Sequence, residues 1–153
     1  MKKDRILSRI LYFFGVVLLA YSLFALVYQS ILTFRIDWSS LSHEDAVDMR
    51  SYVILEFVTI IFKMVIASYG IYSRHHVDET INPLFTFTIF YSIFVILQAM
   101  SLVNTLSGLT FKQLAEHYKY VISTAAIDVI VAAFYLTVTI ILKMDDWRGE
   151  RNE

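Results

Sequence analysis

The sequence predicts an all-α integral membrane protein, a bundle of four transmembrane helices with short loops and both termini in the cytoplasm. Hydrophobic residues make up 58% of the 153-residue chain and its mean hydropathy is +0.60, so it has too little polar sequence for a soluble domain of this size. Charged residues also leave four intervals, each long enough for the roughly 20 helical residues that cross a bilayer. We expect one domain, residues 1–153, whose spans cover about 8–33, 51–73, 84–106 and 120–142.

The positions of Lys and Arg predict the orientation of these spans. Eight of them lie in the two terminal tails and in the loop between the second and third spans, whereas four lie in the first and third loops. Cytoplasmic loops carry an excess of these residues, so both termini and the second loop are expected inside the cell. The predicted location is the cytoplasmic or plasma membrane of the cell.

The first span, about 8–33, follows a basic tail and could be taken for a signal peptide. Its uncharged stretch of 25 residues exceeds the usual apolar core of a signal, and no small-residue cleavage site is well placed after it. We therefore expect this segment to be retained as a transmembrane helix. Tyr12 and Tyr28, near its two ends, suit the membrane interfaces.

The loop after this span contains a signal for the start of a helix. Ser42 followed by Asp45 has the spacing of an N-capping residue with an acid three positions on, so the second helix is expected to begin near His43, before the membrane. His43-Glu44 also begins a zinc-protease pattern. The second ligand position of that pattern is occupied by Val47, so we expect no such site.

The second span carries two full charges, Glu56 and Lys63. A charged side chain at mid-membrane costs about 2.5 to 3.5 kcal/mol on insertion scales and rarely faces lipid. Because the two residues are seven apart, they return to nearly the same helix face after two turns. Thr59, Ala67 and Gly70 fall on the same stripe, which we expect to face protein, with Gly70 as a packing residue.

The second loop has a polar part at 73–79. It is expected to end at Asn82-Pro83, a pair that predicts a break before the third span. His75 and His76 lie in this loop. Adjacent histidines point in different directions on a helix and chelate poorly alone, so a solvated turn is favoured over a metal site.

The third span carries Gln98 as its most polar interior residue. Tyr91 precedes Gln98 by seven residues, so both side chains share one helix face. In the following loop, apolar residues recur at helical spacing over 111–118 and predict a short helix lying in the membrane interface.

The fourth span holds Asp128, the third charge within the membrane. Ala125 and Ala132 are seven residues apart and form a small-residue seam suited to close helix packing, and Tyr135 follows Asp128 at the same spacing. This seam is expected to be the packing face of the helix.

Alternating helix direction brings the polar residues of three spans to overlapping depths. Glu56, Lys63, Gln98 and Asp128 are therefore expected to form an intramembrane polar cluster. We expect Lys63 to pair with Asp128, with Glu56 as a second acceptor. The cluster can fix the helices in one register, or its unbalanced carboxylate can be protonated and titrate.

The sequence also narrows the classes of function. It has no cysteine, its histidines lie outside the spans, and it has no phosphate-binding glycine loop, nucleophile elbow or calcium-binding loop. We therefore expect no enzyme, no catalytic residue, no metal, no cofactor and no nucleic-acid partner. The expected function is that of an accessory, assembly or scaffold subunit that contacts the bilayer and other membrane subunits or itself. The alternative is a small oligomeric proton-linked transporter or channel that uses the intramembrane carboxylates.

Topology mapping tests the predicted orientation. A reporter fused after Glu153 should be cytoplasmic, and tags in the 36–50 and 110–118 loops should be reached only from outside, because most Lys and Arg residues lie on the side of the termini. A cytoplasmic tag in either loop would reverse the assignment.

Overall fold

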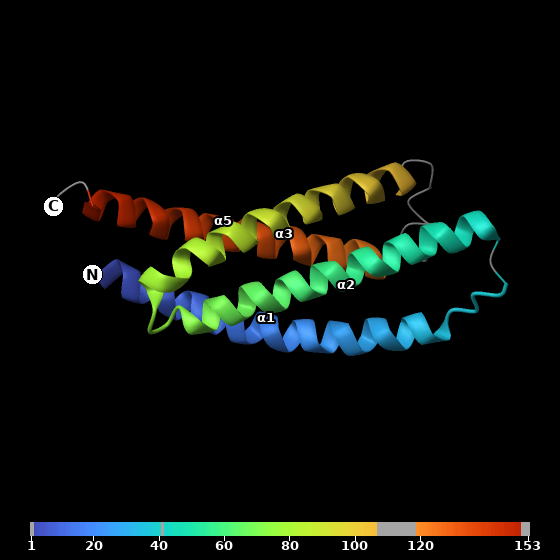
Figure 1. Ribbon diagram of the computed structural model, residues 1–153, viewed down its shortest axis with the longest axis horizontal. Helices are drawn as coiled ribbons and strands as arrows, with labels where there is room; N and C mark the ends of the chain where they lie inside the picture. The colour runs from blue at the N-terminus through green and yellow to red at the C-terminus, as the bar shows by residue number, and fades with distance from the viewer. Residues whose placement is uncertain (1, 41, 107–118, 151–153) are drawn as a thin grey trace.

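The computed structural model describes residues 2–40, 42–106 and 119–150, and within them the chain forms four long helices (Figure 1). The helices are α1 (Lys2–Arg35), α2 (His43–Tyr72), α3 (Val77–Leu106) and α5 (Lys119–Glu150). Each contains a segment long and apolar enough to cross a membrane, and together they pack as a bundle. The predicted fold class of a four-helix membrane bundle is confirmed.

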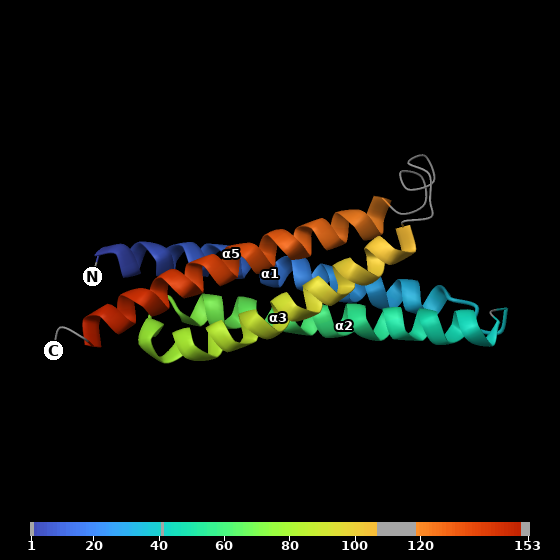
Figure 2. The same cartoon turned by 90° about the horizontal axis from the view of Figure 1, so that it is seen from above.

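The helices alternate in direction, so that α2 and α5 run the same way and α1 and α3 run the other way (Figures 1 and 2). Helix α1 lies mainly along α2, α3 lies mainly along α5, and contacts between α2 and α3 join the two pairs. Both termini lie at the same end of the bundle as the turn between α2 and α3, whereas the connection from α1 to α2 lies at the opposite end.

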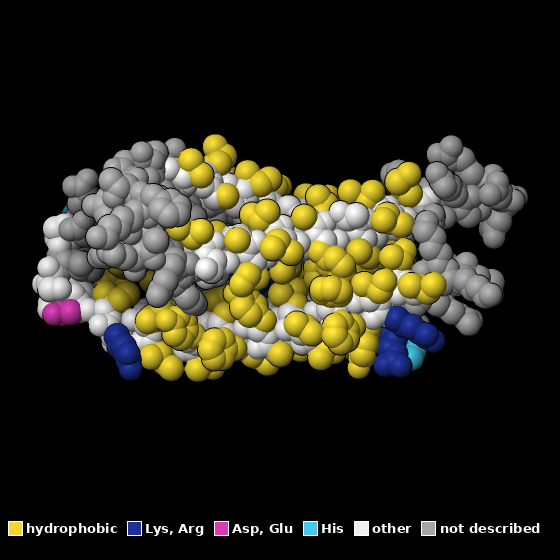
Figure 3. Space-filling model, turned by 180° about the vertical axis from the view of Figure 1, so that it is seen from behind, with side chains coloured by type: hydrophobic (Ala, Val, Ile, Leu, Met, Phe, Trp, Pro, Cys, Tyr) yellow, Lys and Arg dark blue, Asp and Glu magenta, His cyan; other side chains and the backbone are white. Residues whose placement is uncertain are grey.

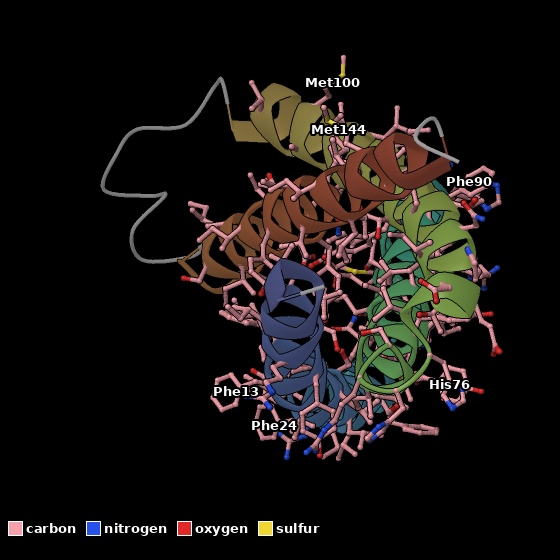
Figure 4. All side chains as sticks on the ribbon, turned by 90° about the vertical axis from the view of Figure 1, so that its left-hand side faces the viewer. Phe13, Phe24, His76, Phe90, Met100 and Met144 are labelled. Carbon is pink, nitrogen blue, oxygen red and sulfur yellow. The ribbon has the colours of Figure 1, made fainter. Side chains whose placement is uncertain are left out.

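The outer surface of the bundle is apolar along its middle. Yellow hydrophobic side chains cover this part in Figure 3, and Lys and Arg side chains lie towards the two ends. Seen along the bundle in Figure 4, Phe13, Phe24, Phe90 and Met100 point away from the interior, and all four are well exposed. An apolar exterior of membrane length suits contact with lipid on all sides, so the protein is an integral multi-pass membrane protein.

The start of α2 agrees with the capping signal in the sequence. The helix begins at His43, and the backbone carbonyl of Ser42 accepts a hydrogen bond from the amide of Ala46 at 2.9 Å. In the preceding turn, Ser39 donates its hydroxyl to the Asp37 carboxylate at 2.6 Å and its amide at 3.2 Å. These hydrogen bonds lower the pKa of the exposed Asp37 carboxyl below its ordinary value.

The start of α3 differs from the sequence prediction. Pro83 does not precede the helix but lies inside it, because α3 already begins at Val77. The break is the shorter turn 73–76, after which Asp78 and Glu79 occupy the first helical turn, where acidic side chains are favoured by the helix dipole. Proline removes one backbone donor, a defect that transmembrane helices tolerate when neighbouring groups compensate. The predicted interfacial helix at 111–118 lies outside the described residues.

Gly15 lets α1 pack tightly against the backbone of α2. A Cβ atom added at Gly15 would lie 2.8 Å from the backbone oxygen of Ala67 and 3.0 Å from the backbone nitrogen of Ile71. Real side chains do not approach backbone atoms this closely, so only glycine fits the observed spacing.

Replacing this glycine should loosen the α1–α2 contact. We expect Gly15→Ala to lower the free energy of unfolding in detergent or bicelles by about 1 to 3 kcal/mol, because the added methyl group meets backbone that cannot rotate away. The exposed Ala20 on the same helix provides a matched control, since Ala20→Leu adds volume on the outer surface. Equal stability of the two variants would show that the contact at Gly15 is not tight.

Candidate functional site

An ion pair between α2 and α5 lies at the centre of the bundle. Lys63 Nζ is 2.7 Å from Asp128 Oδ1, and both side chains are only 1% exposed. This contact agrees with the pair expected from the depths of the two residues. The residues are 65 positions apart in the chain, so the pair joins a helix of the first half of the protein to its last helix.

The other two helices reach the same level. Tyr91 of α3 donates its hydroxyl to Asp128 Oδ1 at 3.1 Å, and the ring of Tyr21 on α1 lies 5.5 Å from Lys63 Nζ. An ammonium group over an aromatic face is attracted by the electrons of the ring. A hydroxyl group that donates to a carboxylate stabilises its negative charge. All four helices therefore contribute a side chain to one polar layer.

A second polar contact joins α2 to α3. Gln98 Nε2 donates to Glu56 Oε1 at 2.8 Å, and Glu56 is 6% exposed. Glu56 was expected to be a second acceptor for Lys63, but the structure pairs it with Gln98 instead. Glu56 and Lys63 are seven positions apart, which places them about 10 Å apart along the helix axis, and the Lys63 ammonium group is bonded to α5.

The four predicted cluster residues thus form two contacts on the polar stripe of α2. Thr59, between Glu56 and Lys63 on this stripe, is fully buried, as are Ala67 and Gly70 further along it. Thr59 donates its hydroxyl to backbone carbonyls of α2 itself, whereas the long side chains of Glu56 and Lys63 bond to neighbouring helices. The stripe of α2 is therefore the surface against which the rest of the bundle assembles.

Sequence reasoning did not place three tyrosines in the site. Tyr91 and Tyr21 contact the ion pair directly, and Tyr135 is buried with a hydroxyl that has no hydrogen-bond partner among the described residues. Asp128 Oδ2 is likewise buried without such a partner. The signal was present in the spacing, because Tyr91 shares a face with Gln98 and Tyr135 with Asp128, but a tyrosine in a membrane helix is also common as a packing or interface residue.

The predicted packing residues behave differently from one another. Ala132 is buried and Gly70 is packed so closely that an added Cβ would lie 3.1 Å from both the Leu11 backbone oxygen and the Tyr135 hydroxyl oxygen. Ala125, in contrast, is only half-buried. The seam of α5 is therefore in contact with the bundle around Ala132 and more open towards the start of the helix.

An apolar groove runs between α3 and α5 and has a volume of about 510 Å³. Small side chains, among them Ala99, Ala132 and Ala133, leave this space, and exposed apolar residues such as Val103 and Val129 border it. The groove is distinct from the ion pair, which lies between α2 and α5.

Within the part of the chain that the structure describes, no three His, Asp or Glu side chains are close enough together to hold a metal ion. The comparisons with known proteins found no matching family model, no matching curated protein and no matching solved structure.

A double-mutant cycle tests the strength of the Lys63–Asp128 contact. Lys63→Met and Asp128→Leu should each lower the free energy of unfolding by about 3 to 5 kcal/mol, because each leaves an unpaired buried charge. The double variant should lose much less than the sum, since no charge of the pair remains. Unfolding of all four proteins in the same bicelles gives the coupling.

A parallel cycle with Lys63→Met and Glu56→Gln serves as the control. Its coupling should be smaller, because these two side chains make no ion pair. Additive losses in the Lys63–Asp128 cycle would remove the pair as a source of stability.

Proposed function

We propose that this protein is an accessory, assembly or scaffold subunit of the cell membrane that binds other membrane proteins or further copies of itself. The observation that supports this role is the internal pairing of the cluster. Two contacts make up this pairing. Lys63 of α2 pairs with Asp128 of α5, and Gln98 of α3 donates to Glu56 of α2, so the polar groups hold the bundle together. The apolar outer surface is then available to lipid and to partner helices.

The physics of membrane helices favours this interpretation. Lipid tails are as apolar as leucine, so helices gain little from hydrophobic contact with one another, and polar pairs and close packing hold them in place. A buried ion pair contributes little net stability compared with an apolar core, but it can specify one arrangement. Such an arrangement gives a rigid surface of fixed shape, which is what a scaffold requires.

A second candidate is a small proton-linked carrier or channel. It is favoured by Glu56, a buried carboxylate that forms no ion pair with any described Lys, Arg or His side chain. It is also favoured by two buried oxygen atoms that have no hydrogen-bond partner among the described residues, Asp128 Oδ2 and the Tyr135 hydroxyl. Intramembrane carboxylates are common working parts of proton-coupled transport.

The double variant Lys63→Met/Asp128→Leu separates structural pairing from a direct functional role. Native membranes are extracted gently, and the size and composition of the assembly that contains the tagged protein are measured. We expect wild type and the double variant to enter the same larger assembly, because the surface that binds partners is apolar and the pair is internal.

Two results would contradict a subunit role in which the ion pair only holds the bundle together. The first is a double variant that folds normally and no longer assembles, which would give the charges a direct part in function. The second is a monomeric wild-type protein that carries a pH-driven flux in proteoliposomes and loses it on Glu56→Gln, which would support the carrier.

A further inference from the structure

We propose that Glu56 is a proton-binding site, at which a carboxyl group inside the bundle takes up and releases a proton towards the end where α1 connects to α2. Asp128 stays ionised beside Lys63 in this assignment. The proposal concerns the charge state of the bundle and rests on neither proposed function, since a subunit and a carrier could both contain such a site.

The charge count of the buried cluster supports this assignment. Lys63 and Asp128 neutralise each other at 2.7 Å, which leaves Glu56 as the only other buried charge among the described spans. An isolated carboxylate in a medium of low polarity is so costly that the group usually neutralises by taking up a proton. The pairing pattern therefore favours Glu56 over Asp128 as the carboxyl group that binds the proton.

Among the described residues, no cation is free to neutralise Glu56. On α3 its partner is the neutral amide of Gln98. The charged groups that act on it are the carboxylate of Asp128 on α5 and the ammonium group of Lys63 on α2, which is already paired with Asp128. Tyr52 is the other titratable group near it on α2. Helix α1 has no charged residue at positions 10–34.

Gln98 is a suitable partner for both charge states of Glu56. A carboxylate accepts a hydrogen bond from the amide nitrogen, whereas a neutral carboxyl group can donate its proton to the amide oxygen after the amide turns over. The distance of 2.8 Å between Gln98 Nε2 and Glu56 Oε1 lies in the normal range for either bond. The contact can thus persist through uptake and release of the proton.

Glu56 is also the more exposed of the two carboxyl groups in the cluster. The membrane segment of α2 begins at Met49, which places Glu56 about 10 Å along the helix from that end. It is 6% exposed, whereas Asp128 is 1% exposed. A proton therefore has a short route to Glu56 from the end where α1 joins α2.

Infrared spectroscopy of the full chain in lipid tests the proposal directly. A protonated carboxyl group has a carbonyl band apart from the backbone bands, and near neutral pH the solvent-exposed carboxyl groups, with pKa values of about 4, are ionised and do not contribute to it. We expect wild type to show this band near neutral pH, to lose it reversibly as the pH is raised, and to shift it in heavy water. Glu56→Gln should abolish the band.

Two further variants keep the test decisive if Glu56→Gln folds poorly. Lys63→Met/Asp128→Leu removes the ion pair and should keep the band, because Glu56 remains. Gln98→Leu removes the amide that donates to the carboxylate, so the loss of the band should move to higher pH. A band that survives Glu56→Gln, or the absence of any such band in wild type and in Lys63→Met/Asp128→Leu near neutral pH, would overturn the proposal.

Discussion

The ammonium group of Lys63 lies where no bulk water can solvate it, and the arrangement of the helices follows from meeting that need. Its partner Asp128 comes from α5, and the carboxylate of Asp128 accepts a hydrogen bond from Tyr91 of α3. The ring of Tyr21 on α1 lies beside the Lys63 ammonium group. An isolated charge at this depth would be strongly destabilising, so any rearrangement that separates α2 from α5 is penalised. The ion pair thus fixes the register of the helices in the bundle.

Close packing at two glycines holds the helices together away from the polar layer. Gly15 lets α1 approach the backbone of α2 near Ala67, and Gly70 leaves room for the Tyr135 hydroxyl of α5. Both glycines lie nearer than the ion pair to the end of the bundle that carries the termini. Small residues therefore hold that half of the bundle together, whereas hydrogen bonds at Glu56 and Gln98 join the helices in the other half.

Much of the fold could be predicted from the sequence, because intervals without charge set the number of spans and heptad spacing set the inward face of α2. The contact between Lys63 and Asp128 followed from depth alone. The true start of α3 did not, because Pro83 is a strong local signal for a break that the membrane environment overrides. The partner of Glu56 was also missed, since counting residues gives depth and not the rotation of α3 that brings Gln98 to this carboxylate.

The separation of the ion pair along the chain has a consequence for biogenesis. Lys63 emerges from the ribosome 65 residues before Asp128, so α2 is synthesised with a charge whose partner does not yet exist. Stable burial of α2 has to wait for α5, and a chain that stops after α3 would keep an unmatched lysine in its interior. Completion of the last helix therefore converts a segment poorly suited to lipid into the centre of the finished protein.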